Sequence, residues 1–276
     1  MPRVSGLFLY PVKSLRGHAV PAAELDALGF IGDRRFMIVD SAGQFLTQRT
    51  LPRLACIDAR LAPGTLTLSA EGAGSITVST TPDPSAPLRT VSIWKSENLQ
   101  AEDCGSAISA WLSHFLECKT HLVRIGPKFR RPMTKSAALP GELVHFGDAE
   151  PLLIVSEASL ADLNDRIQEN GGEPVPMNRF RPNIVISDCA PFAEDHWPRL
   201  RIGADVVVRH GGLCARCIVT TTHQFTGLRD SKEPLKTLAT YRRDAADPTD
   251  VNFGTNLIHE TKSGTIRIGD EVTPIR

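Results

Sequence analysis

The sequence predicts a mixed α/β fold that is rich in β-structure, with its first half closed up as a barrel or a strongly bent sheet. Three observations predict this class. Most segments are short and β-branched or alternating, turn residues separate them, and only a few stretches have helical periodicity. The composition agrees, because 41% hydrophobic and 22% charged residues in 276 positions describe a globular chain with a sizeable core.

The strand-like segments of the first half are punctuated by Gly, Pro and Asp. They occupy residues 4–10, 35–40, 66–70, 75–80 and 90–94. Residues 40–49 resemble a hairpin in which Gly43 can adopt a positive φ. Strand signals return later in the chain, at residues 183–187, 204–210, 217–222 and 265–272.

Helices are predicted in three places. In residues 105–117 the apolar positions recur at i, i+3, i+4, i+7 and i+8, which is a one-sided stripe. Residues 156–172 begin with the capping-type Ser156 and end at a Gly-Gly pair. A third, shorter helix is predicted within residues 233–243.

Charge and cysteine content exclude several classes of protein. Lys plus Arg and Asp plus Glu each number 31, so no global field draws the chain to nucleic acid or to an anionic membrane. No apolar run reaches the length of a signal h-region or a membrane span. Six scattered cysteines do not suggest a disulfide framework, and we therefore expect a reducing, cytoplasmic location.

A change of character near residues 119–140 predicts a domain boundary, with one domain over residues 1–120 and a second over 121–276. This stretch is basic, punctuated by Pro and Gly, and poor in periodic signal. It is interpreted either as an exposed linker with solvated charges or as an electropositive approach to an anionic ligand. The basic residues concerned are Arg124, Lys128, Arg130, Arg131 and Lys135.

The segment "GGLCARCIVTTTHQFTG" carries a C-x-x-C pair, Cys214 and Cys217, ahead of a β-branched run. A zinc site needs four ligands, and no second such pair exists. A redox dithiol expects a helix after the pair, whereas the following residues favour a strand. Two interpretations remain open: a single functional thiolate with Arg216 beside it, or two core cysteines.

Cationic and hydroxyl side chains recur at predicted strand ends. Each case alone is an ordinary loop-to-strand junction, but together they suit a phosphate, because charge-assisted bonds to a dianion are strong. The chain has no glycine-rich phosphate loop, no metallohydrolase or serine-hydrolase motif, and no iron–sulfur spacing. The residues are Lys13 and Ser14, Arg34 and Arg35, and Arg179, Arg181 and Asn183.

These segments together resemble the MOSC family, named for the C-terminal domain of molybdenum cofactor sulfurase. Within it they resemble the branch of the mitochondrial amidoxime-reducing component and its bacterial relatives. "YPVKSLRG" and "GDRRFMIVD" resemble the MOSC-associated N-terminal domain, and "LLIVSEASLADLN", "NRFRPNIVIS", "LCARCIVTTTHQFTG" and "GTIRIGDEV" resemble the MOSC domain. The resemblance implies a MOSC β-barrel packed against an N-terminal β-barrel-like domain, with a few peripheral helices.

The resemblance also implies a cofactor, the molybdenum cofactor, whose pterin carries a phosphate. It assigns Cys217 as the thiolate ligand of molybdenum, a soft donor for this metal. Asn183 is the candidate for shaping the substrate side. The residues that it assigns to cofactor binding are Lys13, Ser14, Arg34, Arg181, Arg216 and Cys217. Two departures stand out: Ala215 where relatives carry serine, and Asp148, Ala149 and Glu150 where they carry hydroxyl residues.

The implied function is a molybdenum oxidoreductase that reduces small N-hydroxylated compounds. Its electrons are expected from a separate ferredoxin-, flavoprotein- or cytochrome-type protein, because the chain ends at "DEVTPIR" without an iron–sulfur domain. One alternative is a molybdenum cofactor carrier or sulfur-transfer protein that uses a persulfide on Cys217. Another is a binding module of the same fold without the metal.

Overall fold

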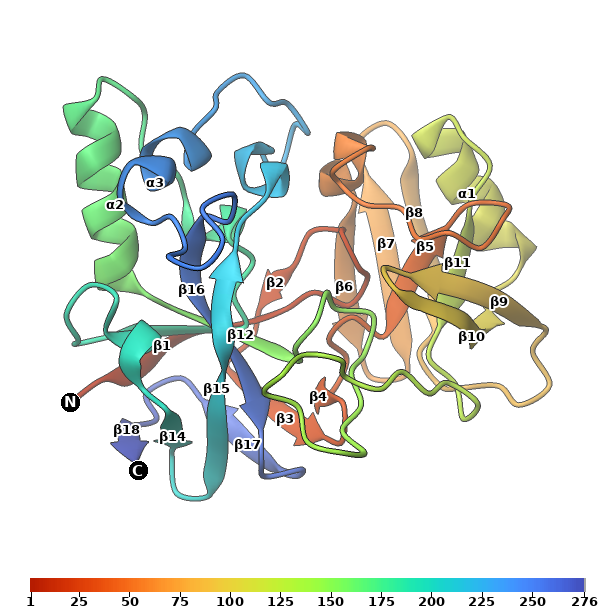
Figure 1. Ribbon diagram of the computed structural model, residues 1–276. Coiled ribbons are helices and arrows are strands. Elements are labelled where there is room, and N and C mark those ends of the chain that lie inside the picture. The colour runs from red at the N-terminus through yellow and green to blue at the C-terminus, as the bar shows by residue number, and fades with distance from the viewer. Residues whose placement is uncertain (276) are drawn as a thin grey trace.

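Two β-rich bodies lie side by side in the computed structural model, which describes residues 1–275 (Figure 1). The large body is built on an eight-stranded sheet, and both ends of the described chain lie in it. In spatial order this sheet contains β18 (Val272–Ile275), β14 (Arg199–Ile202), β15 (Val206–Ala215), β16 (Asn252–His259), β12 (Leu152–Ser156), β13 (Ile184–Ser187), β1 (Arg3–Leu9) and β2 (His18–Ala19). A smaller sheet of β17 (Gly264–Arg267), β3 (Ala22–Asp26) and β4 (Gly29–Phe30) shares its hydrophobic core.

The small body contains two further sheets. One has the order β5 (Phe36–Val39), β11 (His121–Arg124), β10 (Ser96–Asp103) and β9 (Leu88–Ile93). The other is formed by β6 (Asp58–Ala62), β7 (Thr65–Ala70) and β8 (Gly74–Ser79). Strand β5 is buried along its whole length: Phe36 and Ile38 pack into one cluster, and Met37 and Val39 pack into another. Such an apolar run without alternation is what a strand covered on both faces requires.

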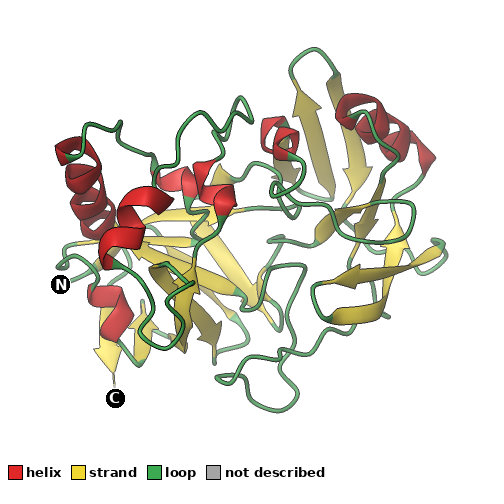
Figure 2. Ribbon diagram, turned by 45° about the horizontal axis from the view of Figure 1, so that its top comes forward, coloured by secondary structure: helices red, strands yellow, loops and turns green. Residues whose placement is uncertain are grey.

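The α-helices lie at the periphery. Figure 2 shows α1 (Ser106–Leu116) and α2 (Glu157–Glu169) at opposite outer edges of the molecule. The predicted cap forms, because the Ser156 hydroxyl accepts a bond of 3.0 Å from the Ser159 amide. The other helices are α3 (Leu235–Tyr241) and the 3-10 turns η1 (Pro52–Cys56), η2 (Met177–Arg179), η3 (Ala193–His196) and η4 (Ile218–Thr221). Among the described residues, no helix has the length and hydropathy to cross a bilayer.

The predicted fold class is confirmed, but two predicted strands are wrong. The stretch 265–272 is interrupted, because β17 ends at Arg267, whose amide donates to the Asp270 carboxylate at 2.7 Å, and β18 begins only at Val272. Within residues 217–222 the chain forms the 3-10 turn η4 (Ile218–Thr221) and no strand. The hydroxyls of Thr220 and Thr221 donate to the carbonyls of Cys217 and Ile218, at 3.0 and 2.8 Å. Such bonds to a carbonyl three residues earlier compete with the sheet ladder, so the local hydrogen bonds outweigh the β-propensity of the run. Cys217 therefore follows the end of a strand and does not begin one.

The predicted division at residue 120 stays a prediction, and strand pairing crosses it in both directions. Strand β1 pairs with β13, β3 pairs with β17, and β11 pairs with β5 and β10. The interpretation of the basic stretch as solvated charge is wrong for two of its members. Arg124 is buried against Glu102 at 2.7 Å, and Arg131 is also buried.

Candidate functional site

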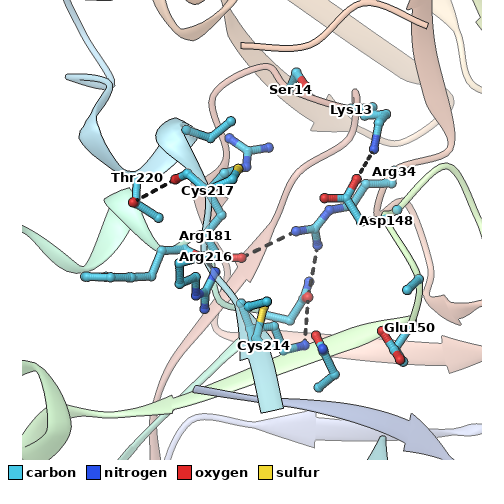
Figure 3. A pocket seen from close by; sticks show the side chains of 18 of the residues that line it. Lys13, Ser14, Arg34, Asp148, Glu150, Arg181, Cys214, Arg216, Cys217 and Thr220 are labelled. Carbon is cyan, nitrogen blue, oxygen red and sulfur yellow. Dashed lines mark hydrogen bonds and ion pairs between the residues drawn. The ribbon is translucent and has the colours of Figure 1, made fainter. Parts of the chain in front are cut away.

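A pocket forms where loops of the small body meet the ends of β12, β13 and β15 (Figure 3). Residues far apart in the sequence converge here, from the loops near residues 13, 34 and 49 to the segment that follows β15. Every predicted site residue lines this pocket: Lys13, Ser14, Arg34, Arg181, Asn183, Arg216 and Cys217.

The two cysteines of the C-x-x-C pair occupy different environments, and both thiols are free. Cys214 packs against the cluster that includes Phe180 and Phe253, and burial raises the pKa of its thiol. Cys217 lies past the end of β15, and only its carbonyl is committed, as an acceptor from Thr220. Both cysteines line the pocket, but Cys217 does not pack against the apolar cluster that covers Cys214.

Arg216 is fixed between the two cysteines by backbone carbonyls. Its Nε donates to the Phe253 carbonyl at 2.7 Å, and its Nη1 donates to the Phe180 carbonyl at 2.9 Å. Its Nη2 is buried and has no partner in the described structure. A buried guanidinium donor without an acceptor is rare in native proteins, so this nitrogen indicates a missing acceptor in the pocket.

Arg34 and Arg181 lie against the ring of Tyr10, with their guanidinium carbons 4.4 and 4.3 Å from its centroid. Burial raises the pKa of Tyr10 to about 12, although both arginines oppose that shift, so the ring stays neutral. Burial lowers the pKa of Arg181 to about 10, which still leaves it charged at neutral pH. The stacking holds both cations in place at the pocket.

Asn183 lines the pocket but is only 1% exposed. Its Oδ1 accepts from Arg34 Nη1 at 2.9 Å and from the Leu153 amide at 3.3 Å, and its Nδ2 donates to the Phe8 carbonyl at 3.3 Å. Since these bonds engage both ends of the amide, the geometry favours a role in positioning Arg34. The predicted role of Asn183 on the substrate side remains a prediction.

Lys13 forms an ion pair with Asp148 across the pocket. The indole nitrogen of Trp94 also donates to Asp148, at 3.1 Å. The Lys13 ammonium holds the pKa of the Asp148 carboxyl well below its usual range. Burial lowers the pKa of Lys13, and Asp148 opposes that change. Ser14, the neighbour of Lys13, has a positive φ of 67°.

Comparison with known proteins places the chain in a family. Residues 1–119 match the MOSC N-terminal beta barrel domain, and residues 142–273 match the MOSC domain. The chain belongs to the MOSC family. This membership confirms the resemblance predicted from the motifs.

The curated relatives place the MOSC chain within a branch of the family. It is 38% identical to mitochondrial amidoxime-reducing component 1 of Mus musculus, over 98% of this chain and 81% of the relative. The corresponding protein of Homo sapiens is 37% identical, over 98% of this chain and 82% of the relative. That of Danio rerio is 33% identical, over 99% and 84%.

The MOSC pocket also contains a carboxyl group without a partner. Glu150 is 9% exposed, lines the pocket, and forms no hydrogen bond or ion pair through its side chain within residues 1–275. Burial raises its pKa to about 7; Lys135 opposes the shift and Asp148 adds to it. Glu150 is one of the departures from the MOSC pattern noted in the sequence.

Arg131 supports the MOSC pocket from behind. Its guanidinium donates to the carbonyls of His145, Gly147 and Asp148 at 2.8, 2.6 and 2.8 Å. These bonds fix the loop that presents Asp148 and Glu150 to the pocket. Arg131 is therefore a structural residue of this loop and not a solvated linker charge.

Two residues at the MOSC pocket, the buried Asp33 and the pocket-lining His145, have no role in the sequence-based interpretation. Asp33 is fully buried and accepts from Arg34 Nη1 at 2.5 Å and from the Tyr10 amide at 2.8 Å. His145 Nε2 lies 3.3 Å from the same carboxylate. Asp33 has a signal in the sequence, because it directly precedes Arg34 in "GDRRF"; His145 has none, because the Asp33 carboxylate that it approaches belongs to a distant segment.

Proposed function

We propose that this protein is a molybdenum-cofactor-dependent oxidoreductase that reduces small N-hydroxylated compounds with electrons from a separate redox protein. The observation that carries the proposal is the convergence of a free thiol with four cationic groups in one pocket. These groups are Cys217, Lys13, Arg34, Arg181 and Arg216. The names of the most similar relatives, amidoxime-reducing components, support the same reaction class.

The chemistry of the donor set fits this cofactor. A cysteine thiolate is a soft ligand that suits molybdenum, and of the two cysteines that line the pocket only Cys214 packs against the apolar cluster of Phe180 and Phe253, which favours Cys217 as the ligand. The orphaned Nη2 of Arg216 needs an acceptor, and a phosphate or pterin oxygen would provide one. When bound, the molybdenum cofactor supplies two-electron redox chemistry.

The residues of the chain bind and orient this anionic group. Arg34 and Arg181 are held by Tyr10 and by backbone carbonyls, so little conformational entropy is lost when they meet an anion. Lys13 carries three N–H donors and uses one on Asp148, which leaves the others for a phosphate oxygen. A buried dianion needs such compensation, because unpaired burial of charge is costly.

The proposal is tested by substituting each cysteine of the pair. The unaltered protein, produced in a host competent for cofactor synthesis, should contain near-stoichiometric molybdenum and reduce benzamidoxime with dithionite-reduced methyl viologen. Cys217→Ser should lose this activity at unchanged melting temperature. Cys214→Ser, the matched control, should retain it. Full activity in Cys217→Ser would contradict the proposal.

The same samples distinguish the proposed reductase from the alternative, a sulfur-transfer protein. That alternative predicts a mass increase of one sulfur atom on Cys217 and little bound molybdenum, both measured on freshly purified protein. The accessible position of the Cys217 thiol is the observation that keeps this second candidate in view. The cytoplasmic location and the division into domains at residue 120 remain predictions.

A further inference from the structure

A groove lies beside the pocket, on the other side of η4. It encloses about 620 Å³ and is lined by η4, by the loop after it and by α3. Within η4, Val219 and Thr220 line the pocket, whereas Ile218 and Thr221 line the groove. A single 3-10 turn, which begins directly after Cys217, therefore separates the groove from the pocket.

The floor of the groove is apolar and open to solvent. Leu235 and Ala239 of α3 line it, and Ile218 of η4 is 45% exposed. An exposed apolar patch rimmed by polar residues commonly marks a protein interaction site.

The charges on the groove have one sign. Among the described residues, its charged lining consists of Arg229, Lys232 and Lys236, with no carboxylate. Lys232 and Lys236 are exposed, and neither forms an ion pair within residues 1–275. Arg229 donates only to Thr222 and to backbone carbonyls of the small body, so its charge is also uncompensated by a carboxylate.

We propose that this groove is the docking surface for an acidic electron-donor protein. The inference rests on the proposed function, which requires electrons from a partner. The chain as a whole has no net charge, so a local cationic surface has to provide electrostatic steering. An apolar floor with a charged rim suits the small, short-lived interfaces of electron-transfer complexes. Docking here brings the donor within one turn of the Cys217 segment.

Charge reversal tests the proposal kinetically in the holoenzyme. The donors are a plant-type [2Fe–2S] ferredoxin, a flavodoxin and cytochrome b5, all acidic. The double variant Lys232→Glu/Lys236→Glu should lower kcat/KM for at least one donor tenfold or more at low salt, with a smaller effect at 0.5 M salt. With dithionite-reduced methyl viologen the variant should match the unaltered enzyme, because a small reductant needs no docking.

The matched control makes the same change in net charge elsewhere. Arg201 of β14 and Arg267 of β17 are exposed and lie away from η4, so Arg201→Glu/Arg267→Glu should alter donor kinetics less than twofold. An equal loss in both double variants, or donor kinetics that do not change with ionic strength, would overturn the docking surface.

A binding measurement separates this proposal from the proposed function. Carbodiimide cross-linking of each donor to the cofactor-free protein, followed by peptide mass spectrometry, should join donor carboxylates to Lys232 or Lys236. Absence of viologen-driven activity in the unaltered holoenzyme would reject the proposed function, while these cross-links would still support the docking surface. Cross-links at other lysines, or none with any donor, would reject the docking surface.

Discussion

The pocket uses its carboxyl groups in opposite ways. For Asp33, burial by itself raises the pKa, but the Arg34 guanidinium and the His145 side chain lower it to about 2. This group stays ionised and holds Arg34 in place. Glu150 has no such partner, and burial raises its pKa to about 7. A buried carboxyl therefore either anchors a cation or resists ionisation, depending on what lies within hydrogen-bonding distance.

The unpartnered carboxyl predicts a pH-dependent cost to stability. Because the pKa of Glu150 is raised from 4.5 to about 7 in the folded protein, stability is lost as the pH rises from 4.5 to 7. Glu150→Gln removes this ionisation. The variant should gain stability relative to the unaltered protein across that window, reaching about 3 kcal/mol above pH 7. Urea denaturation of the cofactor-free proteins at pH 5 and pH 8 measures the difference.

The exposed Glu169 at the end of α2 provides the control, since Glu169→Gln should give the same difference at both pH values. A Glu150→Gln gain that does not change between pH 5 and pH 8 would show that Glu150 titrates normally in the folded state.

The sequence predicts residues that line the pocket better than those that support them. Cys217, Arg216, Lys13 and Arg181 stand in recognisable segments, and all of them line the pocket. The supporting bonds of Arg131 are made to carbonyls 14 to 17 residues away, and no local pattern encodes such contacts. Residues that support the pocket, such as Arg131, are identified from the folded structure, whereas motifs are recognised in short segments of the sequence.

At the scale of elements, short-range sequence patterns predict helices and strands correctly where the pattern agrees with the burial of the side chains in the folded protein. The helix predicted over residues 105–117 forms as α1, and the strand predicted over 66–70 forms as β7. The pattern fails at 217–222, where threonine hydroxyls bond to nearby carbonyls and β15 ends. This failure lies at the candidate metal ligand, which is where local rules are expected to give way to function.

Strand β16 supports the pocket through Gly254, which has a φ of +74°. A Cβ at this position would lie 2.6 Å from Val155 Cγ2, 2.8 Å from the Ile154 carbonyl oxygen and 3.4 Å from Arg216 Nη2. Gly254→Ala should therefore lower the free energy of unfolding by about 3 kcal/mol, from backbone strain and overpacking together. It should also reduce the molybdenum content of the purified protein, measured by elemental analysis.

A substitution at Gly171 separates backbone strain from overpacking. Gly171 has the same φ of +74°, but a Cβ added there would have nothing within 4 Å. Gly171→Ala should cost only about 1 kcal/mol and leave the molybdenum content unchanged. Equal effects of the two substitutions on stability and on metal content would show that Gly254 does not support the position of Arg216.

At the scale of the whole molecule, the pocket depends on contacts that no local pattern could predict. Strand β3 pairs with β17, more than 230 residues later, and β1 pairs with β13. These pairings place the Lys13 loop opposite the segment after β15. Strand signals predicted a β-rich first half, and the family resemblance implied a second β-rich domain, but the order of strands within each sheet depends on long-range burial.

A buried amide pair joins the two bodies next to the pocket. Gln224 Nε2 donates to Gln48 Oε1 at 3.0 Å, and Gln48 Nε2 lies 3.3 Å from Gln224 Oε1. Both side chains are almost fully buried. Gln224→Leu leaves the amide of Gln48 partly unsatisfied and should cost about 2 kcal/mol in the free energy of unfolding.

The double variant Gln48→Leu/Gln224→Leu tests whether this pair couples the bodies. Because it removes both polar partners, it should be more stable than the sum of the single effects predicts, by about 1 kcal/mol. Gln48 also donates to the Ser14 carbonyl, so part of the single cost remains in the double variant. Thermal denaturation of the four proteins completes the cycle. Strictly additive effects would mean that the bodies are held together by their other contacts and that this pair contributes no coupling.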